Sequence, residues 1–229
     1  KSAAVVFADA DLDQLIDSVY WGIFFNAGQV CSAMSRLLVH RSIYEQVIER
    51  VRDLALGLTL GPGIDNCDLT PLASATQQRQ VLERCNQAIA QGARLVAGGA
   101  IPQPMAGYFF EPTVFCDVSS DMDLFQQEIF GPVIAITPFD TEQQAWELAN
   151  STDYGLVAGI FSKDINHCLR GIRALKAGQV FVNEWYAGGI ETPFGGTGLS
   201  GFGREKGQEA LYNYVRSKNI AIRVAASST

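Results

Sequence analysis

The sequence predicts an α/β fold: a mostly parallel sheet with helices on both faces, plus a C-terminal edge strand for oligomerisation. Short apolar segments typical of strands alternate with helical patterns of about ten residues. Parallel strands need crossover connections of this kind. The last strand-like segment lies close to the end of the sequence with no helical pattern after it. We therefore expect it at a sheet edge, where it can pair with another subunit.

The elements are expected in a regular order. We predict strands at residues 3–7, 36–40, 94–97, 109–115, 133–138, 157–162, 180–183 and about 215–224. We predict helices at residues 9–25, 43–54, 76–90, 141–149, 165–175 and 208–212. Asp9 or Asp11 is expected to cap the first helix and Ser42 the second, which Gly57 ends. In the helix at 76–90 the spacing directs Val81, Leu82, Cys85 and Ile89 inward.

Composition excludes several classes of protein. The chain has 229 residues, enough for one large domain or two small ones, with 48% hydrophobic and 18% charged residues. The net charge is −7 and Lys and Arg are scattered singly, so we expect no nucleic-acid partner. No apolar run is long enough for a bilayer, and no signal peptide is visible. Five cysteines without a CxxC pair, and only two histidines, predict neither a metal site nor a disulfide framework. Reduced thiols in a cytoplasmic protein are the simplest expectation.

One glycine pattern needs separate treatment. Gly196, Gly198 and Gly201 fit GxGxxG, but the preceding predicted strand ends at Asn183 and position 221 is Ala rather than an acid. The dinucleotide fingerprint requires a strand directly before the glycines and an acid about 20 residues later. We therefore predict a tight loop here.

Cys31 is the candidate nucleophile. It follows a long helical pattern, and Gly28 permits a sharp turn that would expose the thiol to backbone amides. From spacing alone, an inert buried cysteine is an equal interpretation. Neither His40 nor His167 is local to Cys31, so a cysteine hydrolase would need one of them through the fold.

Glu128 is the second candidate. It precedes Ile129, Phe130 and a Gly-Pro pair that forces a turn. A carboxylate held there could accept hydrogen bonds from the vicinal hydroxyls of a ribose. A solvated loop acid is the equal alternative, and Phe130 suits either a core or a flat ring.

Together these segments resemble the NAD(P)-dependent aldehyde dehydrogenase family over nearly the whole chain. The resemblance rests on Asn-Ala-Gly-Gln-Val-Cys at 26–31, Glu-Ile-Phe-Gly-Pro-Val at 128–133, Tyr-Gly-Leu-Val-Ala-Gly at 154–159, Ser-Lys-Asp at 162–164, Gly-Gln-Val-Phe-Val-Asn at 178–183, Pro-Phe-Gly-Gly at 193–196 and Ser-Gly-Phe-Gly-Arg-Glu at 200–205. Several motifs in the family's order are far more specific than any one of them.

The resemblance implies a role for each matching position. Cys31 would attack the aldehyde to give a thiohemiacetal, with its backbone amide in the oxyanion hole. Hydride transfer to NAD or NADP would leave a thioester, which water hydrolyses to the carboxylic acid. Glu128 would hold the nicotinamide ribose and Phe130 would pack near the ring, and Gln77 is expected to touch the cofactor. The substrate-binding residues would be Ser32, Asn183, Trp185 and Phe194.

The resemblance also implies that other parts are supplied elsewhere. Lys1 would close a Glu-Leu-Gly-Gly-Lys run, so the general-base glutamate and the cofactor-binding domain would precede it. The expected division is residues 1–26 as the tail of the cofactor domain and a linker helix, 27–210 as the catalytic domain, and 211–229 as the oligomerisation strand and tail. The chain alone is then expected to be nearly inactive. Gly198 departs from the family, many members of which carry a lysine there.

Three questions stay open at this stage. A truncated, non-catalytic assembly module is an alternative to the enzyme. The expected homo-oligomer could be a dimer or a tetramer. The aldehyde is not determined: Trp185, Tyr186 and Phe194 could form an aromatic wall that suits a quaternary ammonium aldehyde such as betaine aldehyde, or a plain apolar one.

Overall fold

A computed structural model describes residues 1–103 and 105–224. Its centre is a seven-stranded sheet in the order β3-β4-β5-β2-β1-β7-β8. The strands are β1 (Ala3–Val6), β2 (Arg36–His40), β3 (Arg94–Ala97), β4 (Thr113–Cys116), β5 (Val133–Phe139), β7 (Val157–Phe161) and β8 (Gln179–Val182). All neighbours pair in parallel except β3, which is antiparallel to β4. The predicted mostly parallel sheet is confirmed.

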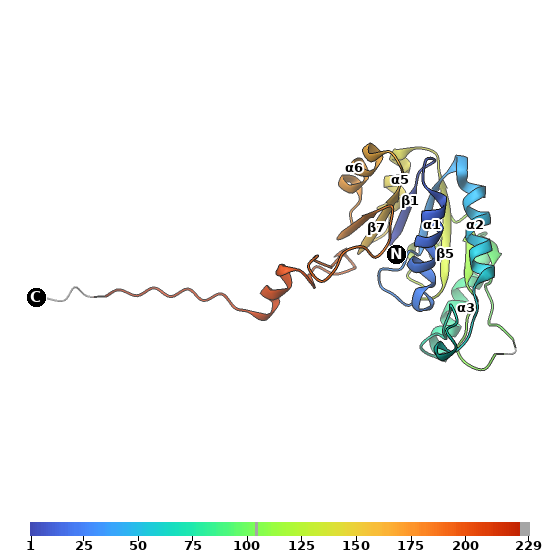
Figure 1. Cartoon of the computed structure of the whole chain (residues 1–229), viewed down its shortest axis with the longest axis horizontal. Helices are drawn as coiled ribbons and strands as arrows, with labels where there is room; N and C mark the ends of the chain where they lie inside the picture. Colours follow the sequence, from blue (N-terminus) through green and yellow to red (C-terminus); the bar gives the residue numbers. More distant parts are fainter. Residues whose placement is uncertain (104, 225–229) are drawn as a thin grey trace, which may run out of the picture.

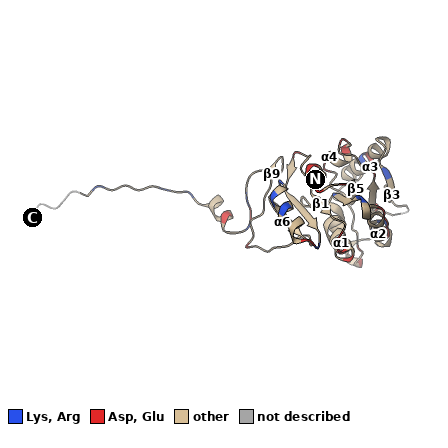
Figure 2. Cartoon of the chain, turned by 90° about the horizontal axis from the view of Figure 1, so that it is seen from above, with Lys and Arg blue, Asp and Glu red and all other residues tan. Residues whose placement is uncertain are grey.

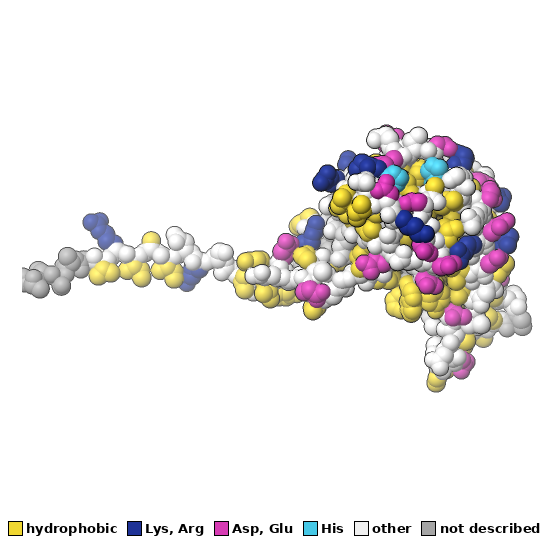
Figure 3. Space-filling view, turned by 45° about the horizontal axis from the view of Figure 1, so that its top comes forward, with side chains coloured by type: hydrophobic (Ala, Val, Ile, Leu, Met, Phe, Trp, Pro, Cys, Tyr) yellow, Lys and Arg dark blue, Asp and Glu magenta, His cyan; other side chains and the backbone are white. Residues whose placement is uncertain are grey.

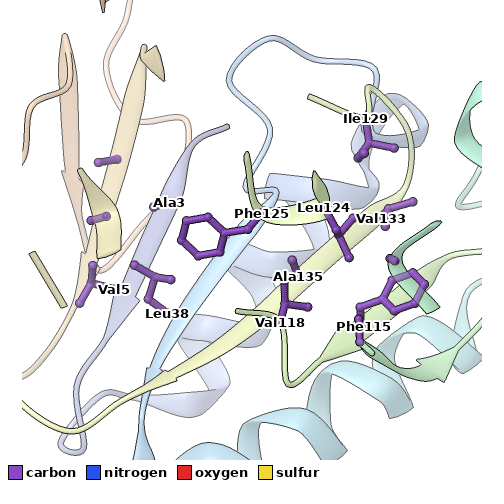
Figure 4. Packing of buried hydrophobic residues seen from close by; sticks show 14 of the residues in the cluster. Ala3, Val5, Leu38, Phe115, Val118, Leu124, Phe125, Ile129, Val133 and Ala135 are labelled. Atoms are coloured by element: carbon purple, nitrogen blue, oxygen red, sulfur yellow. The ribbon is translucent and has the colours of Figure 1, made fainter. Parts of the chain in front are cut away.

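Helices cover both faces of this sheet (Figure 1). The helices are α1 (Leu12–Val19), α2 (Tyr44–Gly57), α3 (Ala75–Ala90), α4 (Asp123–Gln126), α5 (Glu142–Ala149) and α6 (Ile165–Ala174). Because strand side chains alternate between faces, Ala3 and Val5 enter one core while Ala4 and Val6 enter the other. The first core packs under α3 to α6, and Figure 4 shows part of it. The second packs under α1 and α2. Helices on both faces are therefore confirmed as well.

Several boundaries differ from the predictions. The helix predicted at 9–25 ends as an α-helix at Val19 and continues as a π-helical turn, Tyr20–Phe24. Of the strand predicted at 109–115, only residues 113–115 pair with neighbouring strands, and the observed strand ends one residue later, at Cys116. A π turn and the end of a strand depend on tertiary contacts that the local pattern does not report.

Two predicted details of the helices were wrong. Ser42 does not cap α2: a 3-10 turn, Arg41–Ile43, precedes the helix, and the His40 ring accepts the Ser42 N–H. Ile89 was expected inward but is 47% exposed, because it lies on the last turn of α3. Of the two proposed caps of α1, Asp11 serves, and its carboxylate accepts the N–H groups of Asp13 and Gln14.

The C-terminal segment leaves the body of the fold. A 3-10 helix, Gln208–Tyr214, is followed by an extended tail that projects away from the sheet (Figures 1 and 2). Within the described residues of this single chain, the segment predicted as a strand at 215–224 pairs with no other strand. Residues 225–229 of the predicted tail lie outside the described residues.

The predicted division of the chain remains a prediction. β1, from residues 1–26, lies between β2 and β7, from residues 27–210, in the same sheet. None of the helices in the described ranges is long and apolar enough to cross a membrane.

Candidate active site

Cys31 lies in a tight turn between the first helical segment and β2. The Ala33 N–H donates to the Val30 carbonyl at 3.0 Å, which closes a β-turn with Cys31 and Ser32 at its centre. The Cys31 residue is exposed, whereas Cys85, Cys116 and Cys168 are buried. Burial raises the pKa of the Cys85 thiol to about 12 and that of Cys116 to about 12. Cys31 therefore differs from these three in its access to a substrate.

The bend that precedes this turn contains three consecutive residues in the left-handed region. Asn26, Ala27 and Gly28 have φ of 50°, 53° and 71°. Left-handed backbone at residues with a β-carbon is strained and needs support from its surroundings. Asn26 Nδ2 donates to the Gln29 carbonyl at 3.0 Å and Gln29 Nε2 donates to the Asn26 carbonyl at 3.2 Å. This reciprocal pair holds the bend in place.

The bend packs directly on the segment that follows Glu128. A β-carbon built at Gly28 would lie 2.1 Å from the carbonyl oxygen of Gly131, so only glycine fits. Cys31 and Glu128 both precede strands that run in parallel, β2 and β5, which brings them to the same edge of the sheet. Cys31, Glu128 and Phe130 border one pocket there.

Gln77 organises this segment from α3. Its Nε2 donates to the carbonyls of Ile129 at 3.0 Å and Phe130 at 2.8 Å. Phe130 has φ of 57° and a ring that is 39% exposed, and Glu128 is exposed. The Gln77 amide thus holds the loop that presents both side chains, and its predicted contact with a cofactor remains a prediction.

A buried lysine of the pocket, Lys1, and a buried arginine beside it, Arg36, were not among the predicted site residues. The Lys1 Nζ is buried and no hydrogen-bond acceptor of the described residues reaches it. Burial lowers the pKa of Lys1 to about 7, the Arg36 charge lowers it too, and the Glu128 carboxylate opposes both. Arg36 donates to the carbonyls of Lys1, Leu148 and Ala149. A lone arginine in an apolar strand was the signal in the sequence.

A second hollow adjoins the thiol on the side of the glycine-rich loop. Cys31 and Phe194 line it together with the loop at 195–204, and it encloses about 500 Å³. Next to it, Ser32, Tyr186 and Phe194 border a smaller cavity of about 230 Å³. The predicted substrate residues Ser32 and Phe194 are thereby brought close to Cys31. Tyr186, which was considered only as part of an aromatic wall, joins them.

Asn183 and Trp185 lie behind this surface. The Asn183 side chain pairs with the backbone of Ser162, accepting its N–H at 2.9 Å and donating to its carbonyl at 3.0 Å. Trp185 is 8% exposed and its indole N–H donates to the Ser32 carbonyl. Their predicted contact with a substrate remains a prediction, and their observed contacts are with the protein.

The GxGxxG pattern is a loop, as predicted. Gly198 has φ of 61° and a β-carbon there would lie 2.4 Å from the Asp153 carbonyl oxygen. β9 (Thr197–Gly198) pairs with β6 (Tyr154–Gly155) in a separate two-stranded sheet. His40 and His167 border neither of the two pockets described above that Cys31 borders. His40 ends β2, at the opposite end of that strand from the cysteine turn, which disfavours a cysteine hydrolase.

Comparison with known proteins identifies the family. The family model described as "Aldehyde dehydrogenase family" matches residues 1–220. The chain belongs to the aldehyde dehydrogenase family. A chloroplastic betaine aldehyde dehydrogenase of Beta vulgaris is 39% identical over 222 residues, which cover 96% of this chain and 44% of the relative. An aldehyde dehydrogenase of Emericella nidulans is 42% identical over 98% of this chain and 45% of its own length.

Solved structures of the family have the same fold. Betaine aldehyde dehydrogenase from Staphylococcus aureus, in complex with NAD+, has a TM-score of 0.92 and 38% identity over 95% of this chain and 44% of its own. An NAD-dependent aldehyde dehydrogenase from Sinorhizobium meliloti has a TM-score of 0.94 and 35% identity over 100% of this chain and 46% of its own. The chain thus spans less than half the length of the aldehyde dehydrogenases that it matches.

Proposed function

We propose that the protein oxidises an aldehyde to a carboxylic acid with NAD or NADP, using Cys31 as the nucleophile. The observation that supports this most is the shared pocket of Cys31, Glu128 and Phe130. In it an accessible thiol, a carboxylate and an aromatic ring come from two loops that touch backbone to backbone. Membership of the aldehyde dehydrogenase family supports the same reaction.

The residues of this chain account for the covalent steps. The Cys31 sulfur adds to the carbonyl carbon, and the resulting oxyanion is stabilised by the backbone N–H of Cys31. NAD(P), when bound, accepts the hydride that leaves this carbon. The carbon is then held as a thioester of Cys31. Water adds to the thioester, the carbon–sulfur bond breaks, and the acid and the thiol are released.

The exposed side chains at the rim of this pocket suit the part of the cofactor that this chemistry requires. Glu128 presents an exposed carboxylate, which can accept hydrogen bonds from the two hydroxyls of a ribose. The exposed Phe130 ring can pack beside a nicotinamide. The matched relatives are more than twice as long as this segment. We propose that residues outside the segment supply the remaining cofactor contacts and the general base, and that residues 1–229 alone turn over little substrate.

The aromatic side chains near Cys31 support a substrate with a cationic group. Tyr186 and Phe194 border the cavity beside Ser32, and the Phe25 ring lies 6.4 Å from that of Tyr186. The Lys206 ammonium lies 5.7 Å from the Phe194 ring, within the range of a cation–π contact. Two relatives are named for betaine aldehyde and aminoaldehydes. We propose a quaternary ammonium aldehyde as the substrate.

The matched test of this substrate compares betaine aldehyde with its uncharged isostere, in which carbon replaces the ammonium nitrogen. Shape and carbonyl are shared, so the ratio of kcat/KM measures the cation–π contribution. We expect a preference of about fivefold or more for the cation, as one such contact is worth roughly 1 kcal/mol. An equal kcat/KM would indicate a plain apolar pocket.

The tail supports assembly with another subunit. Val215, Ile220, Ile222 and Val224 are 60–82% exposed along an extended segment, where Figure 3 shows hydrophobic side chains lined up on the tail. An extended apolar segment with free backbone groups can add to a sheet edge of a partner. We propose a homo-oligomer, dimer or tetramer, joined through residues 215–224. A non-catalytic assembly module would need the same tail, so the reactivity of Cys31 distinguishes the two functions.

The proposed location is the cytoplasm. The five cysteines are all unpaired in the described residues, which suits a reducing compartment. Relatives named as chloroplastic and peroxisomal show that the family also works in other compartments. Cell fractionation with a compartment marker tests this assignment.

The direct test of the proposed activity is substitution of the nucleophile in the intact protein. Cys31→Ser should abolish NAD(P)-dependent aldehyde oxidation, with Cys67→Ser as the control because Cys67 borders neither of the two pockets around Cys31. Full activity of Cys31→Ser would contradict the proposal.

A further inference from the structure

Trp185 lies under the cysteine turn. Its indole Nε1 donates to the Ser32 carbonyl at 3.1 Å, joining residues that are 153 positions apart in the sequence. This hydrogen bond is buried, and the ring is 8% exposed. A buried N–H that reaches the peptide next to a nucleophile has little freedom to contact a substrate.

The ring is fixed by its neighbours on several sides. A β-carbon at Gly159 of β7 would lie 2.6 Å from Cζ3 of Trp185, and one at Gly22 of the π-helical turn would lie 3.4 Å from Cδ1. The Phe181 ring of β8 packs against it edge-on, with centroids 5.6 Å apart. Three elements thus leave the indole one position, and the direction of its N–H is set by the sheet.

The hydrogen bond acts on the turn that carries the thiol. The Ser32 carbonyl lies within the β-turn that the hydrogen bond between Ala33 and Val30 closes. Fixing this carbonyl therefore restrains the rotation of the neighbouring peptides. The same turn presents the Cys31 sulfur and the Cys31 N–H that the proposed oxyanion needs. The strained bend at residues 26–28 supports the turn from one side only.

We infer that Trp185 is a positioning residue, which orients the Cys31 turn through the Ser32 carbonyl and does not form the wall of the substrate pocket. The kinetic test of this inference rests on the proposed function. The alkylation test depends only on the Cys31 thiol, since alkylation requires no turnover.

The test removes the N–H and keeps an aromatic ring. In Trp185→Phe we expect kcat for aldehyde oxidation to fall about fivefold, the usual effect of one lost hydrogen bond, with KM for the aldehyde nearly unchanged. The rate of Cys31 alkylation by iodoacetamide should change by a similar factor. The matched control is Trp146→Phe, because Trp146 is also buried and its indole N–H lies 3.4 Å from Glu142, away from Cys31. The control should leave both rates unchanged.

A second variant loosens the ring without removing its N–H. Phe181→Leu removes the edge-on contact and should move Cys31 alkylation in the same direction as Trp185→Phe, by a smaller factor. This variant still tests the positioning role of Trp185 if Trp185→Phe does not fold.

Three results would overturn the inference. Unchanged alkylation of Cys31 with a raised KM in Trp185→Phe would make the ring a substrate wall. Faster alkylation of the buried Cys85 and Cys168 along with Cys31 would make it a general packing residue. Unchanged rates in both Trp185→Phe and Phe181→Leu would leave it no role at the turn. If the wild-type protein oxidises no aldehyde but Cys31 alkylation responds as expected, the proposed function fails and the positioning role stands.

Discussion

The backbone at Gly28 touches the backbone at Gly131, so the turn before Cys31 and the loop after Glu128 are one packed unit. A β-carbon at Gly28 would lie 2.1 Å from the Gly131 carbonyl oxygen and 2.9 Å from the Pro132 nitrogen. Both are backbone atoms that cannot rotate away. The relative position of the thiol and the carboxylate is therefore set by a contact that has no room for a side chain.

Gly28→Ala should separate these two loops. The added methyl meets fixed backbone and the φ of 71° disfavours alanine, so we expect a loss of about 2 kcal/mol or more in the free energy of unfolding. Aldehyde oxidation should fall at least tenfold. Denaturant unfolding and kcat/KM measure the two effects.

The matched control for that variant is Gly57→Ala at the end of α2. A β-carbon there meets nothing within 4 Å. We expect unchanged activity and a stability equal to or slightly above wild type, since alanine favours a helix over glycine. Equal effects of the two variants would show that the contact with Gly131 does not matter.

Gln77→Met should loosen the loop that presents Glu128 and Phe130. Methionine keeps the length of the side chain but cannot donate to the carbonyls of Ile129 and Phe130. We expect KM for NAD(P) to rise about fivefold, the usual effect of a lost hydrogen bond, with little change in KM for the aldehyde. Asn86→Met, at an exposed position of the same helix and outside the pocket that Glu128 borders there, is the control. An unchanged KM for the cofactor would show that Gln77 does not contribute to cofactor binding.

The fold and the site were predictable to different degrees. Apolar strands and helical stripes, such as residues 36–40 and 76–90, reappear within a residue or so, because burial on two faces imposes a strong pattern. Cys31 and Glu128 could be proposed as site residues because each lies in a short local motif. The direction of Asn183 and Trp185 was not predictable, because the partners that turn both side chains toward the protein, Ser162 and Ser32, are distant in sequence.

Other parts of the site left no local signal. The contact between Gly28 and Gly131 depends on two loops meeting, and neither loop reports the other. Lys1 is buried beside Arg36 because β1 and β2 pair in the middle of the sheet, and the sequence around Lys1 does not indicate that pairing. The segment at 215–224 is the converse case: its strand-like pattern predicts a strand, but among the described residues of the single chain it pairs with no other strand.

Asp117 should make stability depend on pH below about 4. Its carboxylate accepts hydrogen bonds from Arg94 at 2.7 Å and the Tyr44 hydroxyl at 3.1 Å. Burial alone would raise the pKa of Asp117, but these donors outweigh it and lower the pKa. The stabilisation is therefore present above the unfolded-state pKa of about 3.9 and is lost as the pH falls through the folded-state value.

Asp117→Asn tests this dependence without straining the backbone, since asparagine tolerates the φ of 56° at this position. We expect a loss on the order of 1 kcal/mol at pH 7, since the pair with Arg94 is half exposed. The loss should be smaller at pH 3, as measured by urea unfolding. A loss that is the same at both values would contradict the assignment.

Ile222→Lys should weaken assembly if the tail adds to a partner's sheet. Ile222 is 79% exposed in the single chain, so the substitution costs the isolated fold nothing. We expect the oligomer measured by analytical ultracentrifugation to dissociate at higher protein concentration than wild type. Ile64→Lys, at a loop residue that is 90% exposed, is the control. The same dissociation behaviour in both variants would show that the tail is not part of the interface.

The account depends most on Cys31 as the nucleophile. Its most direct test is mass spectrometry of the intact protein, quenched in acid during turnover with aldehyde and NAD(P). We predict the mass of the acyl group on the peptide that contains Cys31, and none on the peptides of Cys67, Cys85, Cys116 or Cys168. Two results together would contradict it: the wild type oxidises the aldehyde with no acyl group on Cys31, and Cys31→Ser oxidises it at an undiminished rate.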